Sequence, residues 1–188
     1  MADCQSFARN IEKAIRIYHL DSRHGLALPL VATFSCINRN GGNMYRKILV
    51  PTDGSVLSEK AISAAIEFAK NHPGCEIIGF SVAEPLSFNQ IESLTKSGES
   101  DYMAREQLSA KSRVNRIAEL AKAAGVPCET VVAQSTKPHE EIVRAANQYQ
   151  CDCIFMASNG RKGLNKLFIG SETQKVLTTS DVPVLVYR

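Results

Sequence analysis

Tryptophan is absent from this chain of 188 residues, and the other aromatic residues are few. Proteins that bind single-stranded nucleic acids stack the bases on aromatic side chains, so this composition disfavours such a function. The formal net charge is only +3, and no stripe of basic residues interleaved with aromatics occurs. No apolar run reaches the roughly 20 residues that span a bilayer. The sequence therefore predicts a globular domain with its own core, and neither nucleic acid nor membrane as a partner.

The six cysteines form no recognisable metal or disulfide pattern. No C-x-x-C pair is present, and no histidine stands at zinc-finger spacing from a cysteine. Cys151 and Cys153 would project from the same face of a strand, which is poor geometry for a disulfide. We therefore expect reduced cysteines that pack as small apolar residues, as is usual in a reducing cytoplasm.

The signatures of several common enzyme classes are also missing. The chain has no Walker loop G-x-x-x-x-G-K-[ST], no dinucleotide fingerprint G-x-G-x-x-G and no G-x-S-x-G nucleophile elbow. Nucleotidyl transferases with related sheets carry H-x-G-H or K-M-S-K-S elements, and neither occurs here. His72 and His139 stand beside no evident nucleophile, although spacing alone leaves a Ser-His-Asp triad open. We therefore predict a binding protein, with a small hydrolase or transferase as an alternative.

Strand-like and helix-like segments alternate after residue 44. The run Ile48-Leu49-Val50 is short, apolar and closed by Pro51, which is typical of a strand buried on both faces. Ser55 or Ser58 can cap the helix that follows. The expected strands are 48–50, 76–82, 128–133, 152–156 and 184–187, and the expected helices are 55–72, 101–124, 138–149 and 170–179.

Strands that alternate with helices imply parallel pairing through right-handed crossovers. The predicted fold class is therefore α/β, an open doubly wound parallel sheet of five strands with helices on both faces. The spacing leaves the order of the strands open. In such sheets, ligands bind beyond the carboxyl ends of the strands, at the point where the strand order reverses.

A loop that contains glycine follows the fourth expected strand, and Gly170-Ser171 then opens a helix. Glycine lets a ligand approach the backbone closely, and the first amides of a helix are unpaired donors at the positive end of its dipole. Such a helix start is a natural phosphate site. The loop also carries three cations: Arg161, Lys162 and Lys166. A plain turn at Gly160, an ordinary N-cap at Ser171 and solvated loop cations are the alternatives.

The spacing from Gly160 through nine residues to Gly170-Ser171 resembles the G-x-x-G-x9-G-[ST] signature of the ATP-binding branch of the universal stress protein (UspA) family. Three further segments resemble parts of that family in the same order along the chain. Residues 45–55 resemble its first strand and turn, 81–85 the end of its second strand, and 182–186 its last strand. The resemblance covers residues 44–188. Ala157 departs from the signature, which has glycine there, and alanine makes a positive φ costly.

The resemblance implies the strand order 3-2-1-4-5, which would bring Thr52-Asp53 and Met156-Ala157 to one switch point. It also implies ATP there, with or without Mg²⁺, with Asp53 near the ribose and residues 170–173 at the phosphates. A structural Asp-Gly turn is the alternative for Asp53, and a core position the alternative for Met156. Because the Glu172 carboxylate would repel phosphate, it must point away. The residues implied to bind the nucleotide are Pro51, Thr52, Asp53, Val82, Met156, Ala157, Gly160, Arg161, Gly163, Gly170, Ser171, Glu172 and Thr173.

The resemblance further implies a cytoplasmic stress-response protein that binds ATP and acts as a nucleotide-dependent regulator of a protein partner. No catalytic residue and no metal ligand is assigned, and slow ATP hydrolysis stays open. The apolar last strand, Val184–Tyr187, would lie at a sheet edge, and the resemblance implies a homodimer in which two such strands pair. The alternative is a nucleotide-free dimeric stress or interaction module of the same fold, which Ala157 favours.

Residues 1–43 do not read like the rest of the chain. They hold a short amphipathic stretch, Phe7 to Tyr18, and an apolar run, Leu26 to Ile37, that Pro29 interrupts. That run is too short to span a bilayer and late for a signal peptide. We expect either a disordered extension or a misplaced gene start, with Met44 as the true first residue. A membrane anchor is the third alternative.

Overall fold

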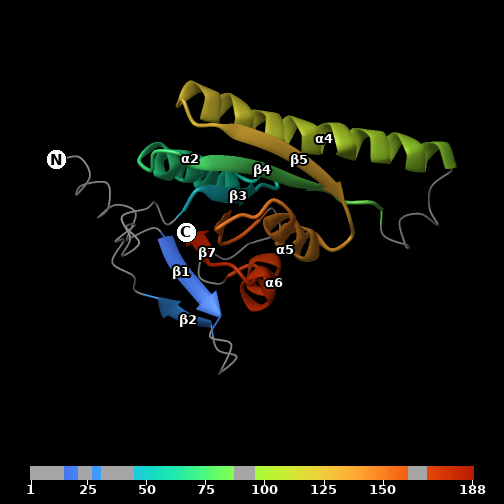
Figure 1. The fold of residues 1–188 in the computed structure, drawn as a ribbon. Helices are drawn as coiled ribbons and strands as arrows, with labels where there is room; N and C mark the ends of the chain where they lie inside the picture. The colour runs from blue at the N-terminus through green and yellow to red at the C-terminus, as the bar shows by residue number, and fades with distance from the viewer. Residues whose placement is uncertain (1–14, 21–26, 31–44, 87–95, 161–168) are drawn as a thin grey trace.

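The computed structural model describes residues 15–20, 27–30, 45–86, 96–160 and 169–188. One sheet runs through these residues, with two helices on each face (Figure 1). The strands are β1 (Ile15–Leu20), β2 (Ala27–Leu30), β3 (Lys47–Pro51), β4 (Glu76–Ala83), β5 (Cys128–Gln134), β6 (Cys153–Ala157) and β7 (Val184–Tyr187). The helices are α2 (Val56–Lys70), α4 (Lys96–Ala123), α5 (Pro138–Gln148) and α6 (Ser171–Thr179).

The five strands from β3 to β7 are parallel and lie in the order β5-β4-β3-β6-β7. Numbered along the chain, this is the order 3-2-1-4-5, so the predicted α/β doubly wound sheet is confirmed. Its central strands are apolar because helices cover them on both sides. Ile48, Leu49 and Val50 of β3 are each at most 1% exposed.

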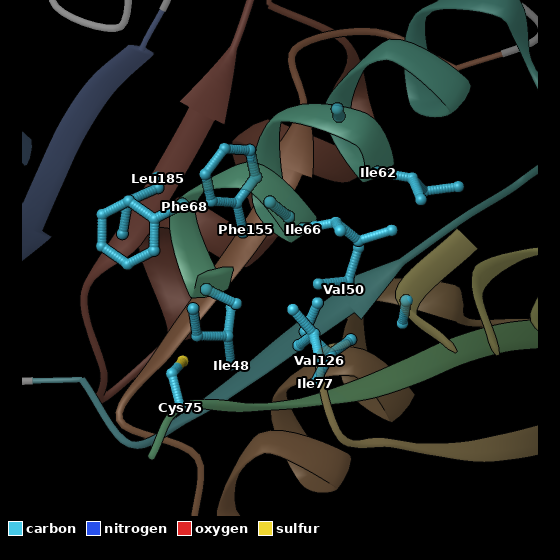
Figure 2. Close-up of a cluster of buried hydrophobic side chains, with 14 of the residues drawn as sticks. Ile48, Val50, Ile62, Ile66, Phe68, Cys75, Ile77, Val126, Phe155 and Leu185 are labelled. Carbon is cyan, nitrogen blue, oxygen red and sulfur yellow. The ribbon is translucent and has the colours of Figure 1, made fainter. Parts of the chain in front are cut away.

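Helices α2 and α4 cover one face of the sheet. In Figure 2, Ile48 and Val50 of β3 lie in one cluster with Phe68 of α2, Phe155 of β6 and Leu185 of β7. The rings of Phe68 and Phe155 are 6.3 Å apart, a tilted arrangement. Burying one such side chain stabilises the fold by about 1.5–3 kcal/mol, so this cluster is a main source of stability.

Helices α5 and α6 cover the opposite face. Successive side chains of a strand point to opposite faces, so Leu49 faces these helices while its neighbours face α2. Leu49 packs there with Ile154 of β6, Ile142 of α5 and Val176 of α6. The two cores together fix β3 and β6 at the centre of the molecule.

The helix boundaries agree with the sequence except at the start of α4. That helix begins at Lys96, whereas we expected it to begin at residue 101. Its first turn carries no apolar periodicity, and periodicity is the main signal of a helix in a sequence. The N-cap of α2 is Ser55, whose hydroxyl accepts the Ser58 N–H at 3.2 Å, as predicted. None of the helices in the described ranges is long and apolar enough to cross a membrane.

Two antiparallel strands from the N-terminal region extend the sheet beyond β7 (Figure 1). Strand β1 pairs with β7, and β2 pairs with β1. These strands lie where we expected an extension without regular structure. The segment of β1 reads Ile-Arg-Ile-Tyr-His-Leu, and such β-branched and aromatic residues favour a strand once a sheet edge is available to pair with. That Met44 is the true first residue stays a prediction.

Candidate functional site

The carboxyl ends of β3 and β6 lie side by side where the strand order reverses. These strands pair in parallel, with Ile48 opposite Cys153 and Leu49 opposite Ile154. The chain leaves β3 toward α2 on one face and leaves β6 toward α6 on the other. The predicted switch point is therefore confirmed, and ligands of open α/β sheets bind at such points.

Asp53 and Gly160 come into direct contact at this switch point. A Cβ atom at position 160 would lie 2.5 Å from Asp53 Oδ2, closer than carbon and oxygen can approach. The other carboxylate oxygen, Oδ1, accepts the N–H of Ser55 at 3.0 Å. The absence of a side chain at residue 160 lets the turn after β6 pass close to Asp53 without displacing its carboxylate.

Backbone contacts tie this turn to the start of α6. The Gly170 N–H donates to the Ser158 carbonyl at 2.8 Å, and a Cβ at position 170 would lie 3.3 Å from that oxygen. The Thr173 hydroxyl donates to the Ala157 carbonyl at 3.0 Å, and the Ser158 N–H donates to Tyr187 at 2.7 Å. Glycine at 170 therefore allows a close approach that places the N-terminus of α6 beside the end of β6.

The first amides of α6 are open. Gly170, and not Ser171, occupies the N-cap, and no side chain in the described part of the chain caps the helix. The N–H groups of Ser171, Glu172 and Thr173 donate to no described residue, whereas the Gln174 N–H is bonded within the helix. Unpaired amides at the positive end of a helix dipole attract an anion.

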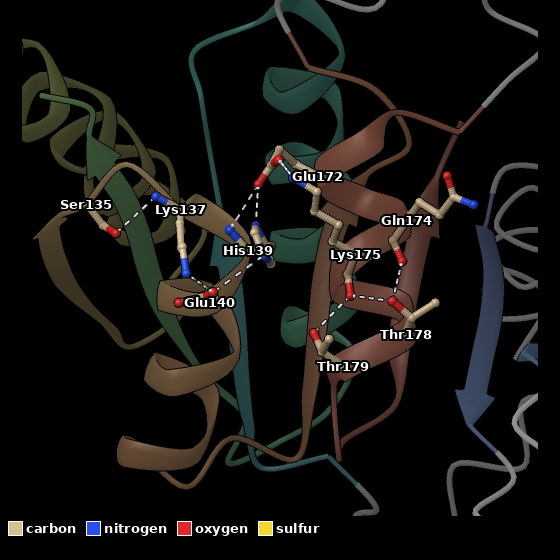
Figure 3. A network of polar contacts seen from close by, with 9 residues as sticks. All are labelled: Ser135, Lys137, His139, Glu140, Glu172, Gln174, Lys175, Thr178 and Thr179. Carbon is tan, nitrogen blue, oxygen red and sulfur yellow. Dashed lines mark hydrogen bonds and ion pairs between the residues drawn. The ribbon is translucent and has the colours of Figure 1, made fainter. Parts of the chain in front are cut away.

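The Glu172 carboxylate turns away from these amides and toward α5 (Figure 3). Its Oε2 atom accepts the backbone N–H of His139 at 3.1 Å and lies 2.9 Å from His139 Nδ1. Its Oε1 atom accepts from Lys175 at 2.9 Å. Burial alone would raise the pKa of Glu172, but the hydrogen bonds from Lys175 and His139 outweigh burial and lower it. The carboxylate is thus held ionised and bonded to His139 and Lys175 rather than to the first amides of α6.

A chain of hydrogen bonds that the sequence did not indicate runs from Arg113 of α4 to the residue that follows β3. The Ser81 hydroxyl donates to the Thr52 carbonyl at 2.9 Å and accepts from Arg113 Nη1 at 3.0 Å. The same Nη1 donates to the Val82 carbonyl at 3.3 Å, and Nη2 donates to Glu106 at 2.5 Å. This guanidinium binds the end of β4 directly and reaches Thr52, the residue after β3, through Ser81, so it positions residues around the switch point.

The turn after β3 is fixed from two further sides. Gly54 has a φ of +78°, which glycine adopts readily, and its N–H donates to Thr52 Oγ1 at 3.1 Å. A Cβ at Gly54 would lie 3.3 Å from Arg113 Cδ, so the turn packs directly on the Arg113 stem. The Thr52 hydroxyl is also 3.1 Å from that of Ser58.

Most of the residues predicted to form the site lie in the described part of the chain. Met156 and Val82 pack in the core beneath α5 and α6. Ser171 is exposed, while the Thr173 side chain is buried and its hydroxyl hydrogen is used by Ala157. Four of the residues named above lie outside the described ranges: Arg161, Lys162, Gly163 and Lys166. Among the residues that the structure describes, no group of His, Cys, Asp and Glu is arranged to hold a metal ion.

Comparison with known proteins gives a consistent family match. The sequence model of the universal stress protein family matches residues 44–188. Universal stress protein MJ0531 of Methanocaldococcus jannaschii is 33% identical over 156 residues, which cover 81% of this chain and 87% of that protein. The solved structure of MJ0577 from the same organism is 30% identical, with a TM-score of 0.65 over 77% of this chain and 96% of that one.

A more distant solved structure has the same fold and holds a nucleotide. It is a universal stress protein in complex with cAMP, 21% identical, with a TM-score of 0.57 over 78% of this chain and 99% of that chain. At this identity the likeness concerns the fold alone. The five parallel strands described above are therefore the common framework of these proteins.

Proposed function

Since the chain belongs to the universal stress protein family, we propose that it is a cytoplasmic stress-response protein that binds ATP where β3 and β6 end. The observation that carries this proposal is the open N-terminus of α6. Its first three amides have no described partner, and the only carboxylate among those residues is held away by His139 and Lys175. Open amides at the positive end of a helix bind phosphate well.

The residues around the switch point fit the remaining parts of an adenine nucleotide. Asp53 can accept hydrogen bonds from ribose hydroxyls, and its position against Gly160 brings it to the loop that leads toward α6. Thr52 and Val82 would meet the base, and the Arg113 chain holds both of their carbonyls in place. A fold of this family accommodates such a ligand, as the structure in complex with cAMP illustrates.

ATP would bring Mg²⁺ to this site. The ion neutralises phosphate charge and is usually bound through phosphate oxygens, several waters and one or two carboxylates. The described part of the chain offers no cluster of acidic or imidazole ligands. The residues therefore fit an ion that arrives with the nucleotide, with the α6 amides and Asp53 as the groups that hold the complex.

A regulator fits these residues better than an enzyme. Among the residues that the structure describes, His139 is engaged with Glu172 and with no hydroxyl nucleophile. Burial raises the pKa of Cys75 and of Cys151 to about 12, so neither thiol is a ready nucleophile at neutral pH. In our proposal, the bound nucleotide and residues 157–170 together form a surface that a protein partner recognises. A homodimer through Val184–Tyr187 is also part of the proposal.

The second candidate is a nucleotide-free module of the same fold. The observation that favours it is the close approach of Asp53 to Gly160, a contact that the protein makes between the two strand ends without a nucleotide. Ala157 adds to this because its side chain occupies a position where the family signature has glycine. In this case the protein would act through its dimer and partner surfaces alone.

Nucleotide content and nucleotide-dependent melting separate the two candidates. The full chain is purified without added nucleotide, denatured by heat, and the released small molecules are identified. Its melting is then compared with Mg-ATP and with Mg-GTP. A ligand at 100 times its Kd adds about 2.7 kcal/mol, which raises the Tm by roughly 5–10 °C for a chain of this length. Released adenine nucleotide, or such a rise in Tm with ATP only, supports the ATP site. A protein that releases no nucleotide and whose Tm changes with neither ATP nor GTP supports the nucleotide-free module.

A further inference from the structure

The two outer strands of the five-stranded parallel sheet differ in how they are protected. Strand β5 carries Glu129, exposes several of its side chains and has α4 packed against it. Strand β7 reads Val-Leu-Val-Tyr and contains no charge and no proline. An apolar strand without such protection readily pairs with a strand of another molecule. The outer edge of β7 is thus the reactive edge of the domain.

In the full chain, β1 occupies this edge. Pro183 and Tyr187 direct their carbonyls toward β6, where they accept from Ile154 at 3.0 Å and Ser158 at 2.7 Å. Backbone groups alternate along a strand, so Val184 and Val186 direct theirs to the other side, toward β1. Their partners in the antiparallel register are Tyr18 and Arg16, respectively. Every backbone group that β7 offers at its outer edge is therefore met by β1.

Strand β2 then ends the sheet with a proline. Since Tyr18 directs its backbone groups toward β7, the residue opposite it on β2 directs its own groups outward. That residue is Pro29, which has no N–H to donate. Prolines in sheets are confined to such outward positions of edge strands, where they discourage further pairing. The hairpin thus replaces an unprotected edge by a protected one.

We infer that the β1–β2 hairpin is an intramolecular cap that competes with a second copy of this chain for the outer edge of β7. A strand edge holds one partner, so β1 and the β7 of another copy exclude each other. A tethered strand competes at an effective concentration on the order of millimolar, well above that of separate copies in solution. The full chain is therefore monomeric at this edge, and release of the hairpin permits a β7–β7 dimer. This inference rests on the proposed dimer through Val184–Tyr187.

Proline substitution in β1 tests the inference in the full chain. Tyr18→Pro removes the N–H that faces Val184, whereas Tyr18→Ala retains it and serves as the matched control. We expect the parent and Tyr18→Ala to sediment as a monomer of 20.6 kDa, and Tyr18→Pro to double in mass. A parent chain that is already dimeric through β7 contradicts the cap, because β1 would then not exclude a second copy.

A fragment and a covalent lock complete the test. Residues 44–188 are expected to fold alone, because the core residues that the structure describes all lie from 45 onward and this part corresponds to 96% of the MJ0577 structure. This fragment should be dimeric, and Val186→Pro within it should restore the monomer. A monomeric fragment would contradict the proposed dimer. A dimeric fragment together with an equally dimeric full chain would contradict only the cap.

For the lock, Ile15→Cys and Tyr187→Cys are combined, since these residues are opposite each other in the register. Oxidation should join the two strands and keep the full chain monomeric even with Tyr18→Pro, and reduction should release the dimer. Each single cysteine variant serves as the control for the native thiols. Dimers that persist after the lock has formed would overturn the competition between β1 and a second copy.

Discussion

Asp53 extends from the end of β3 to the turn after β6, where its Oδ2 atom lies 2.5 Å from the position that a Cβ of residue 160 would take. Its other oxygen is anchored by the N–H of Ser55 at 3.0 Å. A side chain at 160 would therefore require either the carboxylate or the turn itself to shift. The two residues are coupled although they are far apart in the sequence.

We expect Gly160→Ala to lower the free energy of unfolding by about 1–3 kcal/mol, the usual range for overpacking a tight contact. Removal of the carboxylate should relieve the clash, so Gly160→Ala should be less costly in an Asp53→Ala background. Urea unfolding of both single variants and the double variant measures this coupling. Strictly additive free energies would show that the turn adjusts without touching Asp53.

Ser171→Pro tests the phosphate site with little risk to the fold. Proline is well tolerated at the first position of a helix, and Gly170 already has the extended backbone, φ −63° and ψ 152°, that suits a residue before proline. The substitution removes one open amide. We expect the Kd for Mg-ATP to rise roughly 10- to 100-fold, the loss of one hydrogen bond to a charged group of about 1.5–3 kcal/mol.

Ser171→Ala is the control for this experiment, because it removes the exposed hydroxyl and keeps the amide. Calorimetric titration of both variants separates the two groups. If the alanine variant loses as much affinity as the proline variant, the hydroxyl is the main ligand. If neither differs from the parent, ATP does not bind at the start of α6.

The Glu172 network predicts a specific dependence of stability on pH. The folded-state pKa of this carboxyl lies below its ordinary value of 4.5, mainly through hydrogen bonds from Lys175 and His139 that outweigh burial. Its contribution is therefore complete above about pH 4.5 and is lost as the pH falls through the folded-state pKa. We expect Glu172→Gln to cost about 0.5–1 kcal/mol at pH 7, since the side chain is 41% exposed and solvent screens the pair.

Urea unfolding of the parent and Glu172→Gln at pH 7 and at pH 3 gives the test. The difference between them should shrink at the lower pH, because the stabilisation is lost as the pH falls from the ordinary pKa through the lowered folded-state pKa. Glu119→Gln on the surface of α4, where the side chain is 73% exposed, should have almost no effect at either pH. A constant difference for Glu172→Gln would mean that its hydrogen bonds do not depend on the charge.

Local signals in the sequence predicted the parallel sheet and the start of α6. The apolar run at Ile48–Val50 indicates a strand that is buried on both faces. The Gly170-Ser171 pair indicates an open helix start. Gly160 was predicted to let the loop pass close to a bound nucleotide, and this stays a prediction. That Asp53 lies against Gly160 follows only from the adjacency of β3 and β6.

Two features could not be predicted because they depend on tertiary contacts. The strand nature of Ile15–Leu20 depends on the free edge of β7, which lies at the other end of the sequence. Arg113 and Glu106 read as ordinary charged residues of a long helix, and nothing in the helical period marks them as buried. Only the packing of α4 over the end of β4 brings Arg113 to Ser81 and Val82.

The ion pair of Arg113 and Glu106 gives the last prediction. Their side chains are 9% and 16% exposed, so removal of one charge leaves the other with little solvation. We expect Glu106→Leu to lower the free energy of unfolding by about 3–5 kcal/mol, as for other broken buried pairs. The double variant Glu106→Leu with Arg113→Met should be less destabilised than the sum of the two single variants.

An exposed ion pair on the same helix provides the control. Arg116 and Glu119 are 3.8 Å apart with side chains 55% and 73% exposed, so Arg116→Met should cost less than about 1 kcal/mol.

Arg113→Met should also weaken Mg-ATP binding, because the guanidinium holds Ser81 and through it the Thr52 carbonyl. Urea unfolding and calorimetric titration of both variants measure these effects. Equal losses of unfolding free energy and of ATP affinity in Arg113→Met and Arg116→Met would show that the hydrogen bonds of Arg113 do not support the switch point.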